Sequence, residues 1–347
     1  MKTVQSNFHT IIDCDPSADD AIALMLAANS PELHLEGITT VSGVCEAADC
    51  AEHARQVLRL CGRTDVPVYI GARQPLKRTL EFDGAYCGAD GLSETQLPPS
   101  GISDSGKTAA DFLADIFGGK WSSSEETVQI SPSVCKAAET SQKKQENQET
   151  QSEQGVHIIS IAPMTNLARL LLDFPEAAVS IASIITINGS YGVAPDKHRW
   201  NPRPSWNVCA DPEAAKLVLE SGVPVIAAGL DVTMQLQNSL VERLLRDGDR
   251  EKWQYRFLER AIRFNRLHGL EPYSLLVDAM AVAAAVRPEL LSVIRGKAAV
   301  CTDDGLFCGQ TLFGTIGYLS KSESDVSAAY TFDFEGYAEL LLERVFG

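Results

Sequence analysis

The sequence predicts an α/β fold, a single domain with a mostly parallel central sheet flanked by helices. Short β-branched runs alternate with longer helical patterns along most of the 347 residues, a rhythm typical of a parallel sheet covered on both faces. Apolar residues make up 45% of the chain and charged residues 22%, which is enough apolar material for a large core. The length is compatible with one α/β domain.

Strand and helix patterns follow one another in order from residue 10 to residue 233. Strands are expected at 10–15, 35–42, 67–72, 157–162, 183–189 and 224–233. Helices are expected at 19–28, 46–61, 108–117 and 165–174. Acidic residues mark helix starts at Asp19 and Asp211, because the partial positive charge of a helix N-terminus favours a carboxylate.

The last third of the chain turns helical and then returns to strands. Helices are expected at 249–270 and 274–286, strands at 297–303, 310–317 and 326–334, and an amphipathic terminal helix at 336–346.

One segment interrupts this alternation. Residues 139–154 contain no apolar side chain, so they cannot offset the entropy lost on ordering against a core. We expect a polar surface insertion at about 120–154 within one domain that spans 1–347. The alternative interpretation is a linker between two domains.

Charge and cysteine usage restrict the possible partners. The formal net charge of -16 argues against binding to nucleic acid or to an anionic membrane, which requires a basic surface. The nine cysteines are scattered and include no C-x-x-C pair, which disfavours a zinc or disulfide framework. The first residues lack an apolar segment, and no long apolar stretch follows. We therefore expect a cytoplasmic protein.

Four carboxylates stand at the end of the first strand, within eight residues: Asp13, Asp15, Asp19 and Asp20. Like charges at this density are costly unless a cation neutralises them, and oxygen ligands indicate a hard ion such as Ca²⁺ or Mg²⁺. Ligands also bind at this edge of open α/β sheets. Helix capping would explain Asp19 and Asp20, but it leaves Asp13 and Asp15 without a reason.

These residues resemble the inosine-uridine-preferring nucleoside hydrolase family, whose N-terminal fingerprint is D-x-D-P-x-x-D-D. The chain has this pattern at 13–20. Further matches follow in family order: I-T-T-V-x-G at 38–43, G-A-D-G-L at 88–92, P-M-T-N-L-A at 163–168, W-N at 206–207, D-P-E-A-A at 211–215 and V-D at 277–278.

The resemblance implies Ca²⁺-dependent hydrolysis of the N-glycosidic bond of ribonucleosides, with release of free base and ribose. A water bound to the cation attacks the anomeric carbon through an oxocarbenium-like transition state. Asp15 would bind the metal and act as the general base. The further metal ligands would be Asp20, Asp278 and the Ile161 carbonyl.

The resemblance also implies a nucleoside site and a homo-oligomer, either a dimer or a tetramer. Asp19 and Asn207 would hold the ribose 2′ and 3′ hydroxyls, and Asn201 would lie near the 5′ hydroxyl. Further candidates are Asn188 beside the site, the aromatic residues Trp206 and Tyr273, the first-strand Asp13, and His198 for contact with the leaving base. Packing in the core or at the rim is the competing interpretation of the aromatics.

Three positions depart from the family pattern. Val44 stands where the family usually has an asparagine, Ser205 where it often has a glutamate, and Val277 where some members have a histidine. These departures leave open a nucleoside- or ribose-binding member with little turnover. A haloacid-dehalogenase-like phosphatase is a weaker alternative, since Asp13-x-Asp15 and Asp303-Asp304 would fit it but Asp19 and Asp20 would have no role.

Overall fold

The computed structural model describes residues 8–80, 86–118, 155–194, 204–315, 319 and 323–347. Within these residues, the strands are β1 (Phe8–Cys14), β2 (Leu33–Thr40), β3 (Val68–Ile70), β4 (Val156–Ser160), β5 (Ile181–Thr186), β6 (Pro224–Ala227), β7 (Leu291–Val300), β8 (Thr311–Gly314) and β9 (Asp325–Phe332). They form one nine-stranded sheet in the order β3-β2-β1-β4-β5-β6-β9-β7-β8. The predicted polar insertion at about 120–154 lies outside the described residues.

The sheet is mostly parallel, as predicted. All neighbouring strands from β3 across to β9 pair in parallel. Only β7 runs antiparallel to its neighbours, β9 on one side and β8 on the other. The α/β fold class is therefore confirmed.

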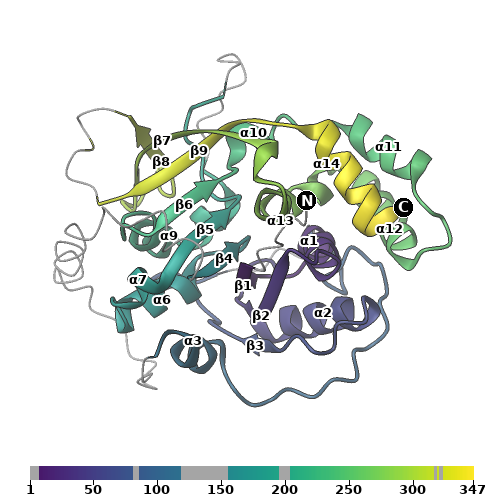
Figure 1. Cartoon of the computed structure of the whole chain (residues 1–347), viewed down its shortest axis with the longest axis horizontal. Helices are drawn as coiled ribbons and strands as arrows, with labels where there is room; N and C mark the ends of the chain where they lie inside the picture. Colours follow the sequence, from purple (N-terminus) through teal and green to yellow (C-terminus); the bar gives the residue numbers. More distant parts are fainter. Residues whose placement is uncertain (1–7, 81–85, 119–154, 195–203, 316–318, 320–322) are drawn as a thin grey trace, which may run out of the picture.

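Helices cover both faces of the sheet (Figure 1). They are α1 (Ala18–Ala28), α2 (Ala47–Leu60), α3 (Ala109–Phe117), α6 (Thr165–Asp173), α7 (Ala177–Ser180), α8 (Trp206–Ala210), α9 (Pro212–Leu219), α10 (Leu230–Thr233), α11 (Asn238–Asp247), α12 (Trp253–Leu267), α13 (Ala279–Val286) and α14 (Phe334–Leu341). Shorter helical turns are η3 (Pro272–Leu276), η4 (Pro288–Leu290) and η5 (Leu342–Phe346). Among the described residues, no helix is long and apolar enough to cross a membrane.

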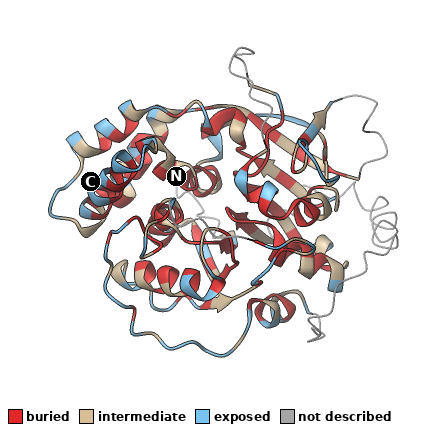
Figure 2. Cartoon of the chain, turned by 180° about the vertical axis from the view of Figure 1, so that it is seen from behind, coloured by how far each residue is buried: buried red, intermediate tan, exposed pale blue. Residues whose placement is uncertain are grey.

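The core consists of two main layers, one on each face of the sheet. Ile12 of β1 packs with buried residues of α1, α2 and α11 to α14. Its neighbour Ile11 points the other way and packs with α3, α6 and α9, because successive side chains of a strand alternate between the two faces. Figure 2 shows buried residues along the strands and on the helix faces turned toward them.

Several predicted element boundaries differ from the structure, and two of the differences have a clear physical reason. The strand expected at 224–233 ends at Ala227, and the helical turn α10 follows it. The strand expected to begin at residue 297 begins at Leu291. Residues 293–295 of β7 are exposed although Val293 and Ile294 are apolar, and the segment shows no strict alternation of apolar and polar side chains by which a half-buried strand is recognised.

The order of the strands creates a switch point between β1 and β4. The chain runs outward from β1 to β2 and β3, then returns to β4 on the other side of β1. At such a point the connections after the two strands diverge to opposite faces and leave a crevice at the carboxyl ends, where open α/β sheets bind ligands. The aspartates that follow β1 lie at this edge.

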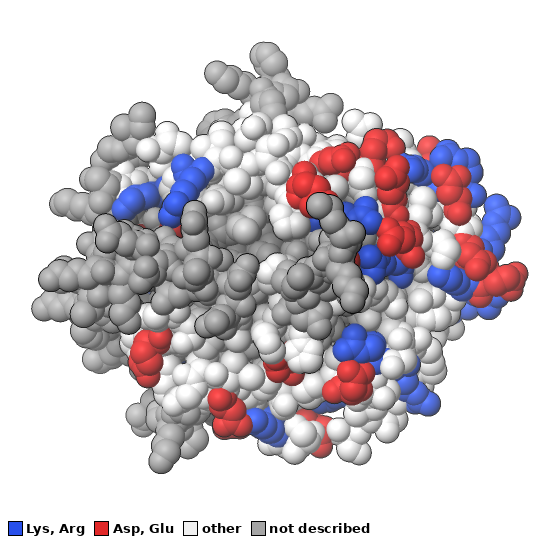
Figure 3. All heavy atoms as spheres, viewed as in Figure 1, with Lys and Arg blue, Asp and Glu red and all other residues white. Residues whose placement is uncertain are grey.

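Charged side chains of both signs share the surface of the C-terminal helices. Figure 3 shows acidic and basic residues interspersed on the side where α11, α12 and α14 lie. Arg243 of α11, for example, forms ion pairs with Asp247, Glu335 and Glu339.

Candidate active site

Four carboxylates from three parts of the chain meet at the carboxyl end of β1. Asp15 follows β1, Asp19 and Asp20 lie in the first turn of α1, and Asp278 is the residue before α13. Oxygen atoms of Asp19, Asp20 and Asp278 lie within 4.8 Å of one another. Asp15 is close enough for its charge to raise the pKa of Asp278. The structure thus places Asp278 beside residues that precede it by more than 250 positions.

Packing between α1 and α13 explains this convergence. The two helices lie against each other within one core layer, and their N-termini both meet the cluster. The positive ends of two helix dipoles therefore face the four carboxylates. This field favours the charged forms, but two half-charges cannot neutralise four carboxylates.

Asp15 is held in a tight backbone pocket. Its side chain is buried, and the backbone N–H of Val44 donates to its Oδ2 at 2.9 Å. A Cβ atom at Gly43 would lie 1.9 Å from the same Oδ2, so only glycine leaves room for this carboxylate. Any residue at position 44 except proline can supply the N–H.

Asp20 has two structural roles at once. Its Oδ2 accepts the N–H of Ser17 at 3.2 Å and its Oδ1 accepts that of Asp15 at 3.3 Å, so it closes the start of α1. It also belongs to the acidic cluster. Asp19 is half-buried and accepts the hydroxyl of Ser17. Helix capping therefore explains part of this sequence, as the alternative interpretation held, but it does not explain the approach of Asp278.

Burial and mutual repulsion raise the pKa of the clustered carboxyls. For Asp15, Asp20 and Asp278 the pKa lies well above its usual range, first because burial disfavours the charged form and then because neighbouring aspartates repel it. Burial also raises the pKa of Asp19. A divalent cation would relieve both effects, and an all-oxygen donor set suits a hard ion. The cluster therefore can hold a metal ion.

Asp13 lies deeper, behind the cluster. It is fully buried, and its Oδ1 accepts hydrogen bonds from Thr39 Oγ1 at 2.6 Å and Asn166 Nδ2 at 2.7 Å. Burial raises its pKa to about 6 although both hydrogen bonds act in the opposite direction. Among the described residues its Oδ2 has no hydrogen-bond partner. Asp13 is thus a buried carboxyl group beside the cluster, and its Oδ2 could accept a further hydrogen bond.

The end of β4 contributes the other wall of the crevice. Ile161 follows β4, and its backbone carbonyl accepts Asn207 Nδ2 at 2.8 Å. Asn188 is fully buried and donates through Nδ2 to the carbonyl of Ala162 at 2.9 Å. Its Oδ1 has no partner among the described residues. A carbonyl has two lone pairs, so the Ile161 oxygen could also bind a cation.

The remaining candidates fall in different surroundings. Trp206 begins α8 and is 51% exposed. Tyr273 is half-buried in η3, where it packs against the larger core layer. Asn201 and His198 lie outside the described residues. Packing therefore accounts for Tyr273, while Trp206 has a free aromatic surface.

The three departures from the family pattern have definite positions. Val44 supplies the N–H to Asp15 described above, and its side chain is half-buried. Ser205 is buried, and its Oγ accepts the N–H of Gly189 at 2.9 Å. Val277 packs against the core layer directly before Asp278. The hydroxyl of Ser205 therefore links the start of α8 to the loop after β5 through this hydrogen bond.

Two supporting residues were missed by sequence reasoning. Asp231 is buried in α10, where it accepts the N–H groups of Tyr191 at 2.6 Å and Val193 at 2.7 Å. His53 is buried in α2, and its Nδ1 lies 2.8 Å from the carbonyl oxygen of Pro16. Asp231 follows β6 as Asp15 follows β1, so its place after a strand was an available signal. Nothing local in the sequence indicates the partner of His53.

The acidic pair of the phosphatase alternative lies elsewhere. Asp304 is exposed after β7 and forms an ion pair with Arg78 at 3.1 Å, outside the aspartate cluster. Two hollows lined by described residues also lie away from the cluster. One of about 480 Å³ is at the start of α12, and one of about 210 Å³ is between α2 and β3. Neither brings together catalytic carboxylates.

Comparison with known proteins identifies the family of the chain. The sequence profile of the family described as inosine-uridine preferring nucleoside hydrolase matches residues 10–339. The pyrimidine-specific ribonucleoside hydrolase RihA of Enterobacter sp. (strain 638) is 31% identical over 341 residues, with 96% of each chain covered. RihA of Escherichia coli O127:H6 (strain E2348/69 / EPEC) is 30% identical, with 96% of this chain and 97% of the relative covered.

Solved structures show the same architecture. The plant nucleoside hydrolase PpNRh1 superposes with a TM-score of 0.76 at 27% identity, covering 97% of this chain and 98% of its own. An inosine-guanosine nucleoside hydrolase, at 22% identity and a TM-score of 0.75, shares the fold over 98% of this chain and 99% of its own. Fold, sequence profile and relatives together show that this chain belongs to the inosine-uridine preferring nucleoside hydrolase family, enzymes that hydrolyse the N-glycosidic bond of ribonucleosides.

Proposed function

We propose that this chain hydrolyses ribonucleosides with Ca²⁺ at the aspartate cluster and Asp15 as the general base. The observation that carries the proposal is the meeting of Asp19, Asp20 and Asp278, with Asp15 beside them, at the switch point of the sheet. Membership of the family supplies the reaction. The metal, the substrate preference and the role of each residue are the parts proposed here.

The donor set supports Ca²⁺. Asp15, Asp20 and Asp278 would provide carboxylate oxygens and Ile161 a carbonyl oxygen, and Ca²⁺ accepts 6 to 8 such ligands in flexible geometry. When bound, a divalent cation supplies a Lewis acid that lowers the pKa of water at the site. Mg²⁺ would need a more regular arrangement of ligands.

Asp15 would accept the proton of the attacking water. The Val44 N–H and the space at Gly43 hold its carboxylate in one orientation. Positive charge beside it favours the ionised form, which is the form that accepts a proton. A base held in this way needs no reorganisation when the proton moves.

Ribose would be held by Asp19 and Asn207, with Asn201 near the 5′ hydroxyl and Asn188 beside the sugar. Asp19 is half-buried at the edge of the cluster, and Asn207 is fixed by its bond to Ile161. As the glycosidic bond breaks, positive charge develops on the ribose ring. Nearby carboxylates, including the buried Asp13, stabilise that charge electrostatically.

The leaving base would contact Trp206 and His198. Trp206 offers an exposed aromatic face on which a base can stack. Val277 offers no proton to the base at the position where some family members have a histidine. Solvent or another donor would therefore protonate the base as it leaves.

A panel of inosine, adenosine, guanosine, uridine and cytidine tests the function. The curated relatives are named pyrimidine-specific, so uridine and cytidine are expected to react faster. Released ribose would be measured as reducing sugar, with Ca²⁺ and after chelation. Hydrolysis that persists without divalent cations would contradict the role of the metal.

A nucleoside-binding protein with little turnover is the second candidate. Val44, Ser205 and Val277 favour it, because they replace side chains that would contact substrate or leaving base. Calorimetry that shows nucleoside binding, together with no base release at high enzyme concentration, would establish this candidate and remove the first.

We also propose that the chain forms a homodimer or homotetramer, as its family resemblance implies. The turn after β7 exposes Leu306 and Phe307, which are 96% and 70% exposed, and Leu312 of β8 is 51% exposed. Such apolar side chains suit an interface between copies. Light scattering coupled to gel filtration would measure the mass, and a monomer at micromolar concentration would contradict the proposal.

A reducing compartment such as the cytoplasm would suit the cysteines. Every cysteine in the described part of the chain is a free thiol, and structural disulfides are rare in reducing compartments. Fractionation of the producing cells with activity measured in each fraction would test this location.

A further inference from the structure

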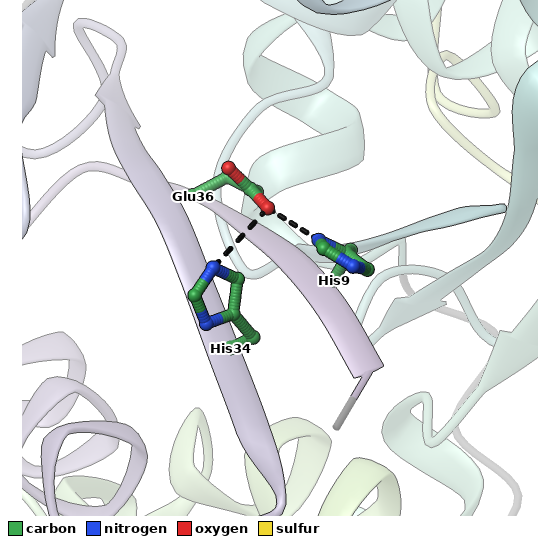
Figure 4. Close-up of side chains that lie close together, drawn as sticks. All are labelled: His9, His34 and Glu36. Carbon is green, nitrogen blue, oxygen red and sulfur yellow. Dashed lines mark hydrogen bonds and ion pairs between the residues drawn. The ribbon is translucent and has the colours of Figure 1, made fainter. Parts of the chain in front are cut away.

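The amino ends of β1 and β2 carry a second group of metal-ligating side chains. His9 of β1 and His34 of β2 are direct partners in the parallel register. Glu36 lies two residues beyond His34, on the same face of the sheet. Figure 4 shows the two rings and the Glu36 carboxylate turned toward one another. All three offer ligand atoms within 4.8 Å of one another.

The atoms of this group converge on one point. His9 Nδ1 contacts Glu36 Oε1, and His34 Nε2 lies 3.5 Å from the same oxygen. Two ligands of a tetrahedral Zn²⁺ ion lie about 3.4 Å apart, since each is about 2.1 Å from the metal. The spacing of His34 and Glu36 therefore already matches a zinc site. The close contact between His9 and Glu36 would have to open, and the ligand nitrogens of His9 and His34, which lie within 4.8 Å of each other, would have to take up a similar spacing.

The donor set and the exposure both favour a transition metal. Imidazole nitrogen suits Zn²⁺ and its neighbours, whereas Ca²⁺ and Mg²⁺ prefer oxygen alone. The side chains of His9 and His34 are 56% and 55% exposed, and that of Glu36 is 25% exposed. Solvent can therefore reach the ion and supply the fourth ligand.

We propose that His9, His34 and Glu36 form a surface binding site for Zn²⁺ that joins β1 to β2. The site is separate from the aspartate cluster, because His9 and Asp15 are six residues apart on an extended strand, or about 20 Å. It does not depend on the proposed hydrolysis. A bound ion would link the amino ends of β1 and β2. The carboxyl ends of the same strands carry the catalytic candidates.

Zinc titration in saturating Ca²⁺ tests the site, because Ca²⁺ keeps the aspartate cluster occupied. Tag-free protein would be stripped of metal, and Zn²⁺ affinity measured by competition with a chromophoric chelator. We expect one Zn²⁺ per chain. His9→Gln and His34→Gln should each weaken binding by at least about tenfold, and the double variant should lose it. Because these residues are exposed, the variants should keep the wild-type melting temperature in the absence of Zn²⁺.

Two matched variants keep the outcome unambiguous. Glu36→Gln keeps the size of the third ligand and should also weaken Zn²⁺ binding, while His268→Gln removes an exposed histidine after α12 and should leave it unchanged. Absence of zinc binding in the wild type, equal binding in the double variant, or equal loss in His268→Gln would each overturn the proposal. Absorption of bound Co²⁺ should indicate nitrogen ligation in the wild type and not in the double variant.

Discussion

Strands β1 and β2 have ionisable side chains at both ends, but the two ends differ in burial and in the chemistry of their donors. At the carboxyl end, Asp15 is 3% exposed and lies beside the carboxylates of Asp19, Asp20 and Asp278. At the amino end, the His9 and His34 side chains are 56% and 55% exposed and share one carboxylate. The carboxyl end is thus buried and has carboxylate ligands only, whereas the amino end is exposed and combines two imidazoles with one carboxylate.

Burial determines what each end demands of a cation. Carboxylates removed from water repel one another, so the carboxyl end is destabilised unless positive charge is present. At the amino end, solvent reaches the side chains of His9 and His34 and screens their interactions. We therefore expect that stability and activity require a cation at the carboxyl end. An ion at the amino end should be optional.

Asp15→Asn, at the carboxyl end of β1, should have the largest effect on activity. The amide keeps the shape and can still accept the Val44 N–H, but it cannot accept the proton of the attacking water. We expect kcat to fall about a thousandfold, measured as ribose released from uridine. Asp65→Asn, which changes an exposed aspartate paired with Arg63, should keep wild-type kcat. Asp15→Asn with more than a tenth of wild-type activity would show that another group is the base.

Metal removal should destabilise the protein at neutral pH and much less in mild acid. In the metal-free folded protein the pKa values of Asp15, Asp20 and Asp278 lie above their unfolded values near 4. The metal-free fold therefore becomes more stable as the pH falls toward 4 and less stable as the pH rises. Free Ca²⁺ at one hundred times its Kd adds about 2.7 kcal/mol, or about 4 °C in Tm for a chain of this length.

Calorimetric or fluorescence melting with and without chelator from pH 5 to pH 8 checks this prediction. The gap between the two melting temperatures should be widest at pH 8 and should shrink toward pH 5, because protons then replace the cation. A gap that is constant with pH, or that widens in acid, would contradict the proposal that these carboxylates hold the ion.

A smaller effect is expected for Gly43→Ala, which tests how tightly the chain packs around Asp15. The added methyl would lie 1.9 Å from Asp15 Oδ2, so the carboxylate must move. We expect a loss of about 1–3 kcal/mol in the free energy of unfolding and about tenfold in kcat/KM. The control is Gly106→Ala, in an exposed turn with open space around the Cβ position, which should affect stability through its backbone conformation but not kcat/KM.

Val44→Asn should have the smallest effect, and it sharpens the meaning of a family departure. The backbone N–H to Asp15 is retained, and the amide adds a polar group where the family usually contacts ribose. One new hydrogen bond is worth about 1 kcal/mol, so KM for uridine should fall about fivefold with kcat little changed. Val44→Thr, which has nearly the shape of valine, serves as the control. An unchanged KM in Val44→Asn would place residue 44 outside the ribose site.

Much of this organisation could be predicted from local patterns. The run Ile11-Ile12 before Asp13 and Asp15 predicts a buried strand that ends in carboxylates, and the next helix starts within a few residues. Confirmation of the family follows from such ordered motifs. Boundaries were harder. The exposed start of β7 contains apolar residues without strict alternation, and the short helix α10 follows closely on a strand-like run.

The sequence by itself determined the fold class, the acidic end of β1 and the family, because each depends on residues close together in the chain. The family resemblance implied that Asp278 joins Asp15 and Asp20, and the tertiary structure shows how α13 brings it there. Only the tertiary structure decided that Gly43 makes room for Asp15 and that His9 faces His34 and Glu36. Those contacts depend on how α1 packs on α13 and on the register of β1 with β2. Long-range packing and strand register arise from the burial of many side chains together, so no short segment specifies them.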